Sequence, residues 1–466
     1  MGNHLKTKYL TQLGYTNNQL RSLVVNIFTR HFKHSGVEEQ WDLLARIKEE
    51  PEAFIADPLT SKIAMAFTAK PQAKKLAYDL LEEHAPLKVY GGKEIEEQAL
   101  KQMKLATSLP VSVQAALLPD AHSGYGLPIG GVLATENVVI PYGVGMDIGC
   151  RMALSILDAG ELYLKRYDYK LKQALRDFTH FGMEGGLAFR QEHEVLDSPL
   201  FKTSSLLKPL HAKAVRQLGS SGSGNHFVEF GEISLHGENS LGLEPKKYLA
   251  LLSHSGSRGL GAAITMHFTK IAMDTCKLPR QAQQLAWLDL QTEAGQAYWQ
   301  HMNFAGEYAQ ACHDRIHANL LRSLGLETLA RVENHHNFAW KDTLPDGREV
   351  IIHRKGATPA HAGELGIIPG SMCTPAYLVR GSGRHSSLFS ASHGAGRAMS
   401  RQKAKNSMTP SALKKMLLKA GVELIGGSVE ENPSAYKDID NVMRAQRDLV
   451  TIEGSFQPRL VRMNKE

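Results

Sequence analysis

Long hydrophobic runs, paired cysteines and internal repeats are missing from this sequence of 466 residues. No apolar run reaches the ~18 residues that a membrane-spanning helix needs, so no membrane segment is expected. The start, Met-Gly-Asn-His-Leu-Lys, has no signal-peptide core. The four cysteines, at positions 150, 276, 312 and 373, are scattered and form no CxxC pair. These absences predict a reduced, cytoplasmic protein.

Two common nucleotide-binding motifs are absent as well. There is neither a GxxxxGK[ST] loop nor a GxGxxG turn between a strand and a helix, so any nucleotide must be held by another device. The net charge is +7, and the part from Ile351 to Glu466 contains 17 Lys plus Arg against 9 Asp plus Glu. This excess fits either a solvated basic face or a surface for RNA, DNA or nucleotide phosphates.

The first 85 residues differ from the rest of the chain. Thr16-Asn17-Asn18-Gln19 fits a capping box, and the apolar residues that follow at helical spacing predict a helix that stops near Gly36. A second helix is expected around Trp41 to Ile47, before Pro51, and a third around Leu76 to Leu81. We therefore expect a small helical extension at 1–85. Its basic residues indicate either RNA contact or an ordinary solvated surface.

Glycine-rich connections and β-branched runs begin near Gly91 and indicate strands interleaved with helices, in contrast to the helical start of the chain. The run from Gly131 to Ile140 predicts a strand, and helices are expected around 161–178, 277–326 and 410–420. No linker or clean boundary follows. The fold class expected for 86–466 is therefore one large mixed α/β (α+β) core with mixed sheets, which must fold as a unit to bring distant residues together.

Asp147 and Cys150 stand three residues apart in a glycine-rich stretch, Gly143-Val-Gly-Met-Asp-Ile-Gly-Cys150. Cys150 alone is explained equally well as a small buried hydrophobic residue. Four histidine clusters lie downstream, around His226, His254, His336 and His393, each beside glycine or asparagine. A thiolate, a carboxylate and several imidazoles suit Zn, Mn or Fe better than Mg or Ca. These ligands exceed one tetrahedral site, which suggests a two-metal centre bridged by the thiolate.

His393 differs from the other histidines because it lies in Ser392-His-Gly-Ala-Gly-Arg397. Small neighbours leave room for a bulky adduct, and arginine is a good phosphate partner. A histidine that attacks a nucleotide phosphorus needs this openness. The segments 354–358 and 368–372 are further candidates for phosphate-binding backbone.

The chain resembles the RtcB family of RNA ligases from about residue 90 to 450. The segments that carry the resemblance occur in the family's order: Pro119–Gly130, Asp147–Cys150, Gly224–Phe227, His254–Gly259, His336-Asn337, Pro369–Met372, His393–Arg397 and Ala435–Asp440. The resemblance implies a GTP- and Mn²⁺-dependent ligase, with two manganese ions. Its partner would be RNA: it would join a 3′-phosphate or 2′,3′-cyclic phosphate end to a 5′-hydroxyl end, in RNA repair or tRNA splicing.

Residue roles follow from the same resemblance. Asp147, Cys150, His254 and His336 would hold one Mn²⁺, and Cys150 with His226 the second. His393 would carry GMP as the catalytic nucleophile. The residues expected around the guanylate are Asn225, His226, Phe227, Val228, Glu229, His336, Asn337, Pro369, Gly370, Ser371, Met372, Gly394, Ala395 and Gly396, with Lys465 for the family's terminal lysine. A release-factor-like or activating helper protein is a further candidate partner.

Several positions depart from the family's pattern. Arg151 and Cys373 stand where glycine is usual, and Ala376 stands where many relatives have serine. These changes leave the metal and nucleophile set intact and suggest a divergent paralogue, suited to RNA repair. Two alternatives stay open: a metal-dependent phosphodiesterase acting on cyclic-phosphate ends, and a non-catalytic RNA-binding paralogue.

Overall fold

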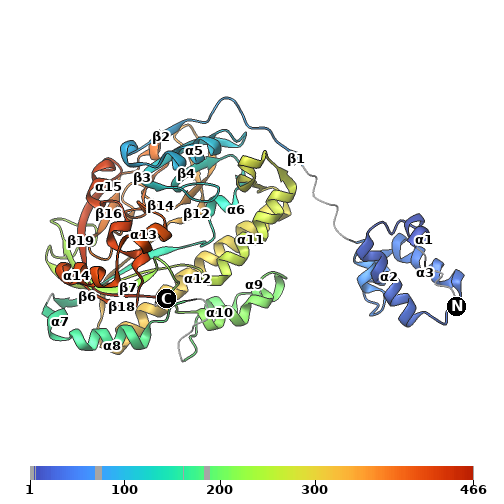
Figure 1. The fold of residues 1–466 in the computed structure, drawn as a ribbon, viewed down its shortest axis with the longest axis horizontal. Coiled ribbons are helices and arrows are strands. Elements are labelled where there is room, and N and C mark those ends of the chain that lie inside the picture. Colours follow the sequence, from blue (N-terminus) through green and yellow to red (C-terminus); the bar gives the residue numbers. More distant parts are fainter. Residues whose placement is uncertain (1–4, 6, 69–75, 161, 183–188, 465–466) are drawn as a thin grey trace. The chain divides into compact units, whose positions relative to one another are not determined.

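The computed structural model describes residues 5, 7–68, 76–160, 162–182 and 189–464 (Figure 1). The chain forms two compact units, Met1–Lys74 and Lys75–Glu466. Helices and strands alternate along the second unit, and the strands form several sheets, which confirms the expected mixed α/β class. None of the described helices combines the length and hydropathy needed to cross a membrane.

The first unit is a small bundle of helices around its own apolar core. Val24 and Phe28 of one helix pack with Leu44 and Ile47 of the next, and Tyr15 donates a hydrogen bond to the carbonyl of Leu44 (2.7 Å). The helices are α1 (Thr7–Gln12), α2 (Asn18–His31), α3 (Val37–Glu49) and α4 (Ser61–Ala64), with a 3₁₀ turn at Pro51–Phe54.

Helix α2 begins one residue later than the capping box predicts. The side chain of Asn17, not Thr16, accepts hydrogen bonds from the amides of Gln19 (2.8 Å) and Leu20 (3.4 Å). Asparagine caps as well as threonine does, so the shift costs little. Gly36 is the residue that precedes α3.

The largest sheet of the second unit has eight strands and carries most of the candidate site. Its order is β11-β6-β8-β7-β19-β16-β15, with β18 alongside β19. The strands are β6 (Arg151–Gly160), β7 (Phe227–Leu235), β8 (Lys247–Ser255), β11 (Thr328–His335), β15 (Leu365–Ile368), β16 (Ala376–Gly381), β18 (Glu423–Ile425) and β19 (Val450–Met463).

A second sheet of five strands has the order β12-β13-β4-β3-β2. Its strands are β2 (Leu87–Val89), β3 (Ser112–His122), β4 (Ile129–Thr135), β12 (Asn337–Thr343) and β13 (Glu349–Lys355). Three short pairs complete the strands: β1 (Leu76–Ala77) with β9 (Cys276–Lys277), β5 (Val138–Val139) with β10 (Leu288–Asp289), and β14 (Ala357–Pro359) with β17 (Ser390–Ser392).

A long helix, α12 (Glu293–Leu324), packs against α11 (Arg258–Thr275) and against β6 and β8. It ends at Gly325, whose φ of +66° gives the left-handed conformation that glycine adopts at helix ends. The remaining helices are α5 (Glu97–Thr107), α6 (Pro141–Val144), α7 (Leu162–Arg166), α8 (Asp168–Phe178), α9 (Leu200–Thr203), α10 (His211–Gln217), α13 (Arg401–Ser407), α14 (Pro410–Ala420) and α15 (Ile439–Ala445).

Three expected elements differ from the structure. The helix expected around Leu76 to Leu81 is wrong, because Leu76 and Ala77 form β1 and pair with β9. The strand expected from Gly131 to Ile140 is broken at Asn137, which has a φ of +52°. The helix expected at 277–326 starts only at Glu293, after a 3₁₀ turn at Arg280–Leu285. The helices expected at 161–178 and 410–420 are confirmed as α7, α8 and α14.

The chain passes from the eight-stranded sheet to the five-stranded sheet at His336. His335 ends β11 in the eight-stranded sheet, Asn337 begins β12 in the five-stranded sheet, and His336 lies between them. The backbone amide of His336 donates to the carbonyl of Cys150 (2.9 Å), and its carbonyl accepts from the amide of Ala357 (3.1 Å). Its side chain is therefore held at the junction of the sheets.

Candidate active site

Strand ends of the eight-stranded sheet bring the expected metal ligands together. Cys150 precedes β6 and His226 precedes β7, whereas His254 lies at the end of β8 and His336 follows β11. Because β6 runs antiparallel to β8 and β11, and β7 antiparallel to β8, these four positions lie at one edge of the sheet.

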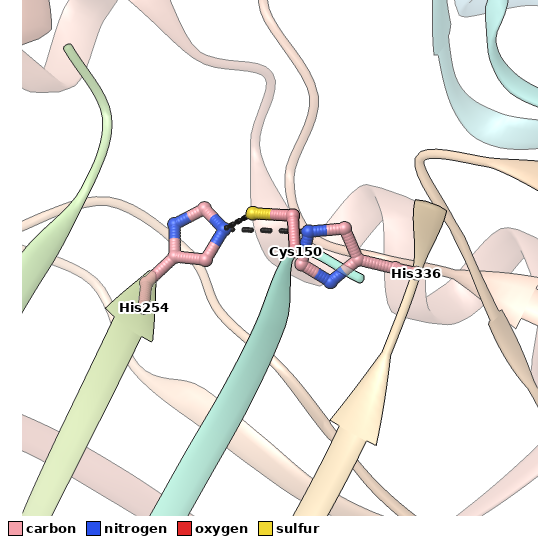
Figure 2. A group of neighbouring side chains, drawn as sticks. All are labelled: Cys150, His254 and His336. Carbon is pink, nitrogen blue, oxygen red and sulfur yellow. Dashed lines mark hydrogen bonds between the residues drawn. The ribbon is translucent and has the colours of Figure 1, made fainter. Parts of the chain in front are cut away.

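The ligand atoms are close to one another. Cys150 Sγ lies 3.2 Å from His254 Nε2 and 3.3 Å from His226 Nε2. His254 Nε2 lies 3.3 Å from His336 Nε2. Figure 2 shows the side chains of Cys150, His254 and His336 pointing toward one another from neighbouring strands. Asp147 Oδ2 lies 3.1 Å from His226 Nε2.

Hydrogen bonding and burial keep the imidazoles of His254 and His336 neutral and leave ring nitrogens free to bind a cation. His254 Nδ1–H donates to the carbonyl of Asn225 (3.1 Å), which leaves a lone pair on Nε2. Burial lowers the pKa of His254 to about 3 and that of His336 well below its usual value, so both rings stay neutral. The buried Nδ1 atoms of His226 and His336 have no hydrogen-bond partner among the described residues. Converging thiol and imidazole donors fit a borderline divalent ion.

The atoms fall into two groups that share Cys150. One group is Cys150, His254 and His336, and the other is Asp147, Cys150 and His226. Asp147 therefore lies with His226, whereas the family resemblance placed it with His254 and His336. The reason is local: Asp147 Oδ1 accepts a hydrogen bond from the amide of Ser257 (3.1 Å), which turns the carboxylate toward His226.

The ionisation of the two acidic ligands depends on their surroundings. Burial opposes ionisation of Asp147, but its hydrogen bond to His226 and the charge of that ring hold its pKa below the usual value. Burial, and next the charge of Asp147, raise the pKa of the Cys150 thiol well above its usual value. A divalent cation reverses this effect, because a coordinated thiol is deprotonated.

His393 follows β17 and is held by a buried carboxylate. Asp120 on β3 is fully buried, and its Oδ2 accepts hydrogen bonds from His393 Nδ1–H (2.6 Å) and from the His393 amide (3.1 Å). This arrangement leaves the Nε2 lone pair of His393 for chemistry. The ring of His393 lies beside that of His336, with 5.1 Å between centroids. His393 is thus adjacent to a candidate metal ligand.

One cavity of about 970 Å³ contains both metal groups and His393. The expected site residues that line it are Asp147, Cys150, Asn225, His226, Phe227, Glu229, His254, His336, Asn337, Pro369, Gly370, Ser371, Met372, His393, Gly394, Ala395 and Gly396. Val228 does not line it, because alternate residues of β7 face opposite sides and Val228 packs in the core. Lys465 lies outside the described residues.

Two backbone segments and a buried acid form part of the cavity wall. The amide of Ala395 donates to the carbonyl of Pro369 (2.9 Å), so the 369–372 and 394–396 segments lie against each other. Burial raises the pKa of Glu229 well above its usual value. This carboxyl group faces the cavity from the same strand as Phe227.

Sequence reasoning gave no role to two further residues at the site. Asp120 lies inside the motif Pro119-Asp-Ala-His122, but only the fold brings it to His393. Lys355 lines the cavity, burial lowers its pKa to about 7, and its Nζ donates to the carbonyls of Tyr125 and Tyr142. A lysine next to Gly356 in a phosphate-binding candidate segment was the only available signal.

Arg397 lines the cavity and is also engaged within the protein. Its guanidinium donates to Glu431 (2.9 Å) and to the carbonyl of Glu430 (2.8 Å), and it stacks on Tyr436. Arg354 of the segment 354–358 is also engaged: it is fully buried and donates to Ser390 (2.7 Å).

The residues that depart from the family's pattern lie either outside the cavity or at its wall. Arg151 donates to Glu333 and to the carbonyl of Gly306 (both 3.1 Å), so its charge is satisfied outside the cavity. Ala376 lines the cavity, and Cys373 packs in a small core beside it. The candidate ligand His336 lines the cavity, whereas its neighbour His335 stacks on Trp340 and does not line it.

Comparison with known proteins decides the family. The family model described as tRNA-splicing ligase RtcB matches residues 102–464. The chain belongs to the RtcB family. This confirms the resemblance carried by the motifs, and every residue of the two metal groups, together with His393, lies within the matched region.

Similar RtcB proteins cover most of the chain. The RNA-splicing ligase RtcB of Escherichia coli K12 is 32% identical over 413 residues, which are 80% of this chain and 97% of that protein. The tRNA-splicing ligase RtcB of Methanococcus maripaludis is 30% identical over 428 residues, 75% of this chain and 87% of that protein. The RtcB family match begins after the small helical unit, which is a separate compact body.

Proposed function

We propose that this RtcB-family protein is an RNA ligase that uses GTP and Mn²⁺ to join a 3′-phosphate or 2′,3′-cyclic phosphate end to a 5′-hydroxyl end. The observation that carries the proposal is the placement of His393. Asp120 orients its ring, and it lies beside His336 in the cavity that holds both candidate metal groups. A histidine nucleophile next to a metal pair is suited to nucleotidyl transfer.

The candidate metal ligands would divide into two groups that share Cys150. One Mn²⁺ would be held by Cys150, His254 and His336, and the other by Asp147, Cys150 and His226. The bound ions would neutralise phosphate charge and polarise phosphorus–oxygen bonds.

The chain's own residues would carry the first step. His393 Nε2 attacks the α-phosphorus of GTP; the nitrogen–phosphorus bond forms as the bond to pyrophosphate breaks. Asp120 holds the Nδ1 proton throughout, as in other catalytic histidine pairs. Glu229 and the backbone of the 369–372 and 394–396 segments would surround the guanylate.

Transfer and sealing would follow. Water would first open a 2′,3′-cyclic phosphate to a 3′-phosphate. An oxygen of the 3′-phosphate would then take the guanylate as its nitrogen–phosphorus bond to His393 breaks. Finally the 5′-hydroxyl would lose its proton, attack the phosphorus of the RNA 3′ end and displace GMP. A 5′-phosphate would add negative charge and block the attacking oxygen, so only a 5′-hydroxyl end is joined.

A helper protein of the release-factor-like or activating kind stays a prediction. A cytoplasmic location is proposed because all four cysteines are free thiols.

The test uses GTP labelled at the α-phosphate, with Mn²⁺, followed by denaturing electrophoresis. The protein should retain label, and the His393→Ala variant should retain none. His385→Ala is the control, because that imidazole is exposed and does not line the cavity. Undiminished label on His393→Ala would exclude His393 as the nucleophile.

Matched oligonucleotides test the chemistry of the ends. Sealing is expected for 3′-phosphate with 5′-hydroxyl ends, and none for 3′-hydroxyl with 5′-phosphate ends. Hydrolysis of a cyclic phosphate without labelled protein would favour a phosphodiesterase. RNA binding without either reaction would favour a binding paralogue.

We further propose that the helical N-terminal extension, expected at 1–85 and compact as Met1–Lys74, is dispensable for guanylylation. A chain starting at Lys75 should form the adduct and bind RNA less well. Loss of the adduct from the folded, shortened chain would show that the extension contributes to the nucleotide site.

A further inference from the structure

The segment that follows the nucleophile loop has an unusual charge. Residues 398–422 contain no Asp or Glu and six basic residues: Arg401, Lys403, Lys405, Lys414, Lys415 and Lys419. They lie on α13 and α14, drawn in red in Figure 1. All six side chains are exposed. Exposed charge of one sign over two successive helices is typical of a surface that meets a polyanion.

The segment starts at the rim of the catalytic cavity. Arg401 and Gln402 line the cavity. The Arg401 guanidinium also lies against Gly224, in the loop that carries Asn225 and His226, where a Cβ would lie 2.7 Å from one of its nitrogens. The first turn of α13 thus reaches the loop that precedes β7 and its metal ligand.

The second helix of the segment is packed on the wall of the same cavity. Leu413 and Leu417 of α14 form a small core with Met372, Val461 and Met463. These last three residues line the cavity. Because α14 buries Leu413 and Leu417 there, Lys414, Lys415 and Lys419 are on its exposed surface.

Four of these lysines have no charged partner. Among the described residues, Lys403, Lys414, Lys415 and Lys419 form no ion pair. Some exposed lysines elsewhere do form one: Lys101 pairs with Glu97, Lys246 with Glu244 and Lys277 with Asp274.

The carboxylates nearest to the segment are already engaged. Glu430 is buried beneath α13 and lies 3.7 Å from Arg401 and 3.2 Å from Lys405. Glu431 pairs with Arg397 (2.9 Å), and Glu423 pairs with Lys172 (2.5 Å). The four lysines therefore keep a net positive charge toward solvent.

We propose that α13 and α14 form a track for the RNA backbone, along which one of the strands to be joined leaves the cavity. Arg401 contacts the phosphate next to the reacting end, and Lys403, Lys414, Lys415 and Lys419 contact phosphates further along. The inference rests on the proposed function, since it takes RNA as the substrate. Contacts to phosphates alone give affinity without sequence preference, as suits a ligase for varied ends.

The test compares two variants with equal loss of charge. The track variant carries Lys403→Gln, Lys414→Gln, Lys415→Gln and Lys419→Gln. The control variant carries Lys202→Gln, Lys246→Gln, Lys270→Gln and Lys277→Gln, four exposed lysines that do not line the cavity. Binding of a single-stranded RNA with a 3′-phosphate is measured over a range of salt concentrations, without GTP.

The track variant should bind RNA roughly tenfold or more weakly near physiological salt, with a salt slope reduced by about 0.7 for each lost phosphate contact. The control variant should bind like the unmodified protein. Guanylylation, which needs no RNA, should be equal in all three and shows that they are folded. Equal RNA binding or an equal salt slope for the two variants would overturn the track.

Photo-crosslinking supplies an independent measurement. RNA with a photoreactive base near its reacting end should attach to peptides from 398–422 of the unmodified protein. Attachment confined to other peptides would also overturn the proposal. Neither measurement depends on GTP. Failure of the track and failure of the ligase assignment, which would appear as an unlabelled protein, are therefore distinguishable.

Discussion

Asp120→Asn should slow guanylylation while leaving metal binding intact. In the structure, Asp120 Oδ2 accepts two hydrogen bonds from His393, one from Nδ1–H and one from the backbone amide. An asparagine side chain can accept one of these but carries no charge. It can also present its amide group to Nδ1, which would favour the tautomer with the proton on the attacking Nε2.

The size of the effect follows from the bond that is lost. A hydrogen bond to a charged group contributes roughly 1.5–3 kcal/mol, which corresponds to a loss of rate of about tenfold to 150-fold. Asp120 is fully buried, so solvent cannot replace the missing acceptor. A wrong tautomer would enlarge the loss further.

The assay is a single-turnover measurement of label transferred from GTP to the protein, with metal content determined on the same samples. Asp120 belongs to neither metal group, so two metals per chain should remain. Asp346→Asn, at an exposed carboxylate that pairs with Arg348, is the matched control and should react normally. An Asp120→Asn protein with an unchanged rate would refute the role of this carboxylate as the orienting group.

Three further predictions concern the metal ligands and the core. Cys150→Ala should remove both metals and all guanylylation, because both ligand groups share this sulfur; elemental analysis that finds full occupancy would contradict the bridge. In Gly256→Ala the new Cβ would overlap the Asp147 carboxylate, so one metal should be lost and the one at Cys150, His254 and His336 kept; loss of both or neither would count against the division into two groups. His353 is buried, with its pKa lowered to about 4 mainly by burial. The unfolded chain therefore binds more protons between about pH 6.5 and 4, and this residue should remove about 2 kcal/mol from the free energy of unfolding as pH falls from about 7.5 to 5. Denaturant titrations of metal-free protein should show that pH dependence reduced in His353→Gln.

The elements that could be predicted from the sequence carry their own local signals. The helix at 410–420 has Thr409 as its N-cap, Pro410 as its first residue and Gly421 as its C-cap, and the bundle helices show apolar residues at helical spacing. Leu76 and Ala77 carry no such signal. They form a strand because Cys276 and Lys277, about 200 residues away in the chain, offer a parallel partner. Tertiary pairing of that kind overrides local propensity.

The candidate site shows the same division. Cys150 and the histidines could be proposed because their residue types and glycine-rich surroundings are unusual in combination. The partner of Asp147 could not, because the choice between His226 and the pair His254 and His336 depends on how the Ser257 amide turns one carboxylate. The pairing of Asp120 with His393 likewise joins residues 273 positions apart.

The place of His336 at the crossing between the two sheets gives a bound metal a mechanical consequence. The candidate ligand His336 is the residue at which the chain leaves the eight-stranded sheet for the five-stranded sheet. Cys150 and His254, in contrast, lie at strand ends of the eight-stranded sheet alone. A metal bound by Cys150, His254 and His336 would therefore link the two sheets. Removal of the metal by a chelator should speed hydrogen exchange of the backbone amides at the start of β12. Amides at the far ends of β7 and β8 should stay as protected as before. Hydrogen exchange can therefore test this link between the sheets without any substrate present.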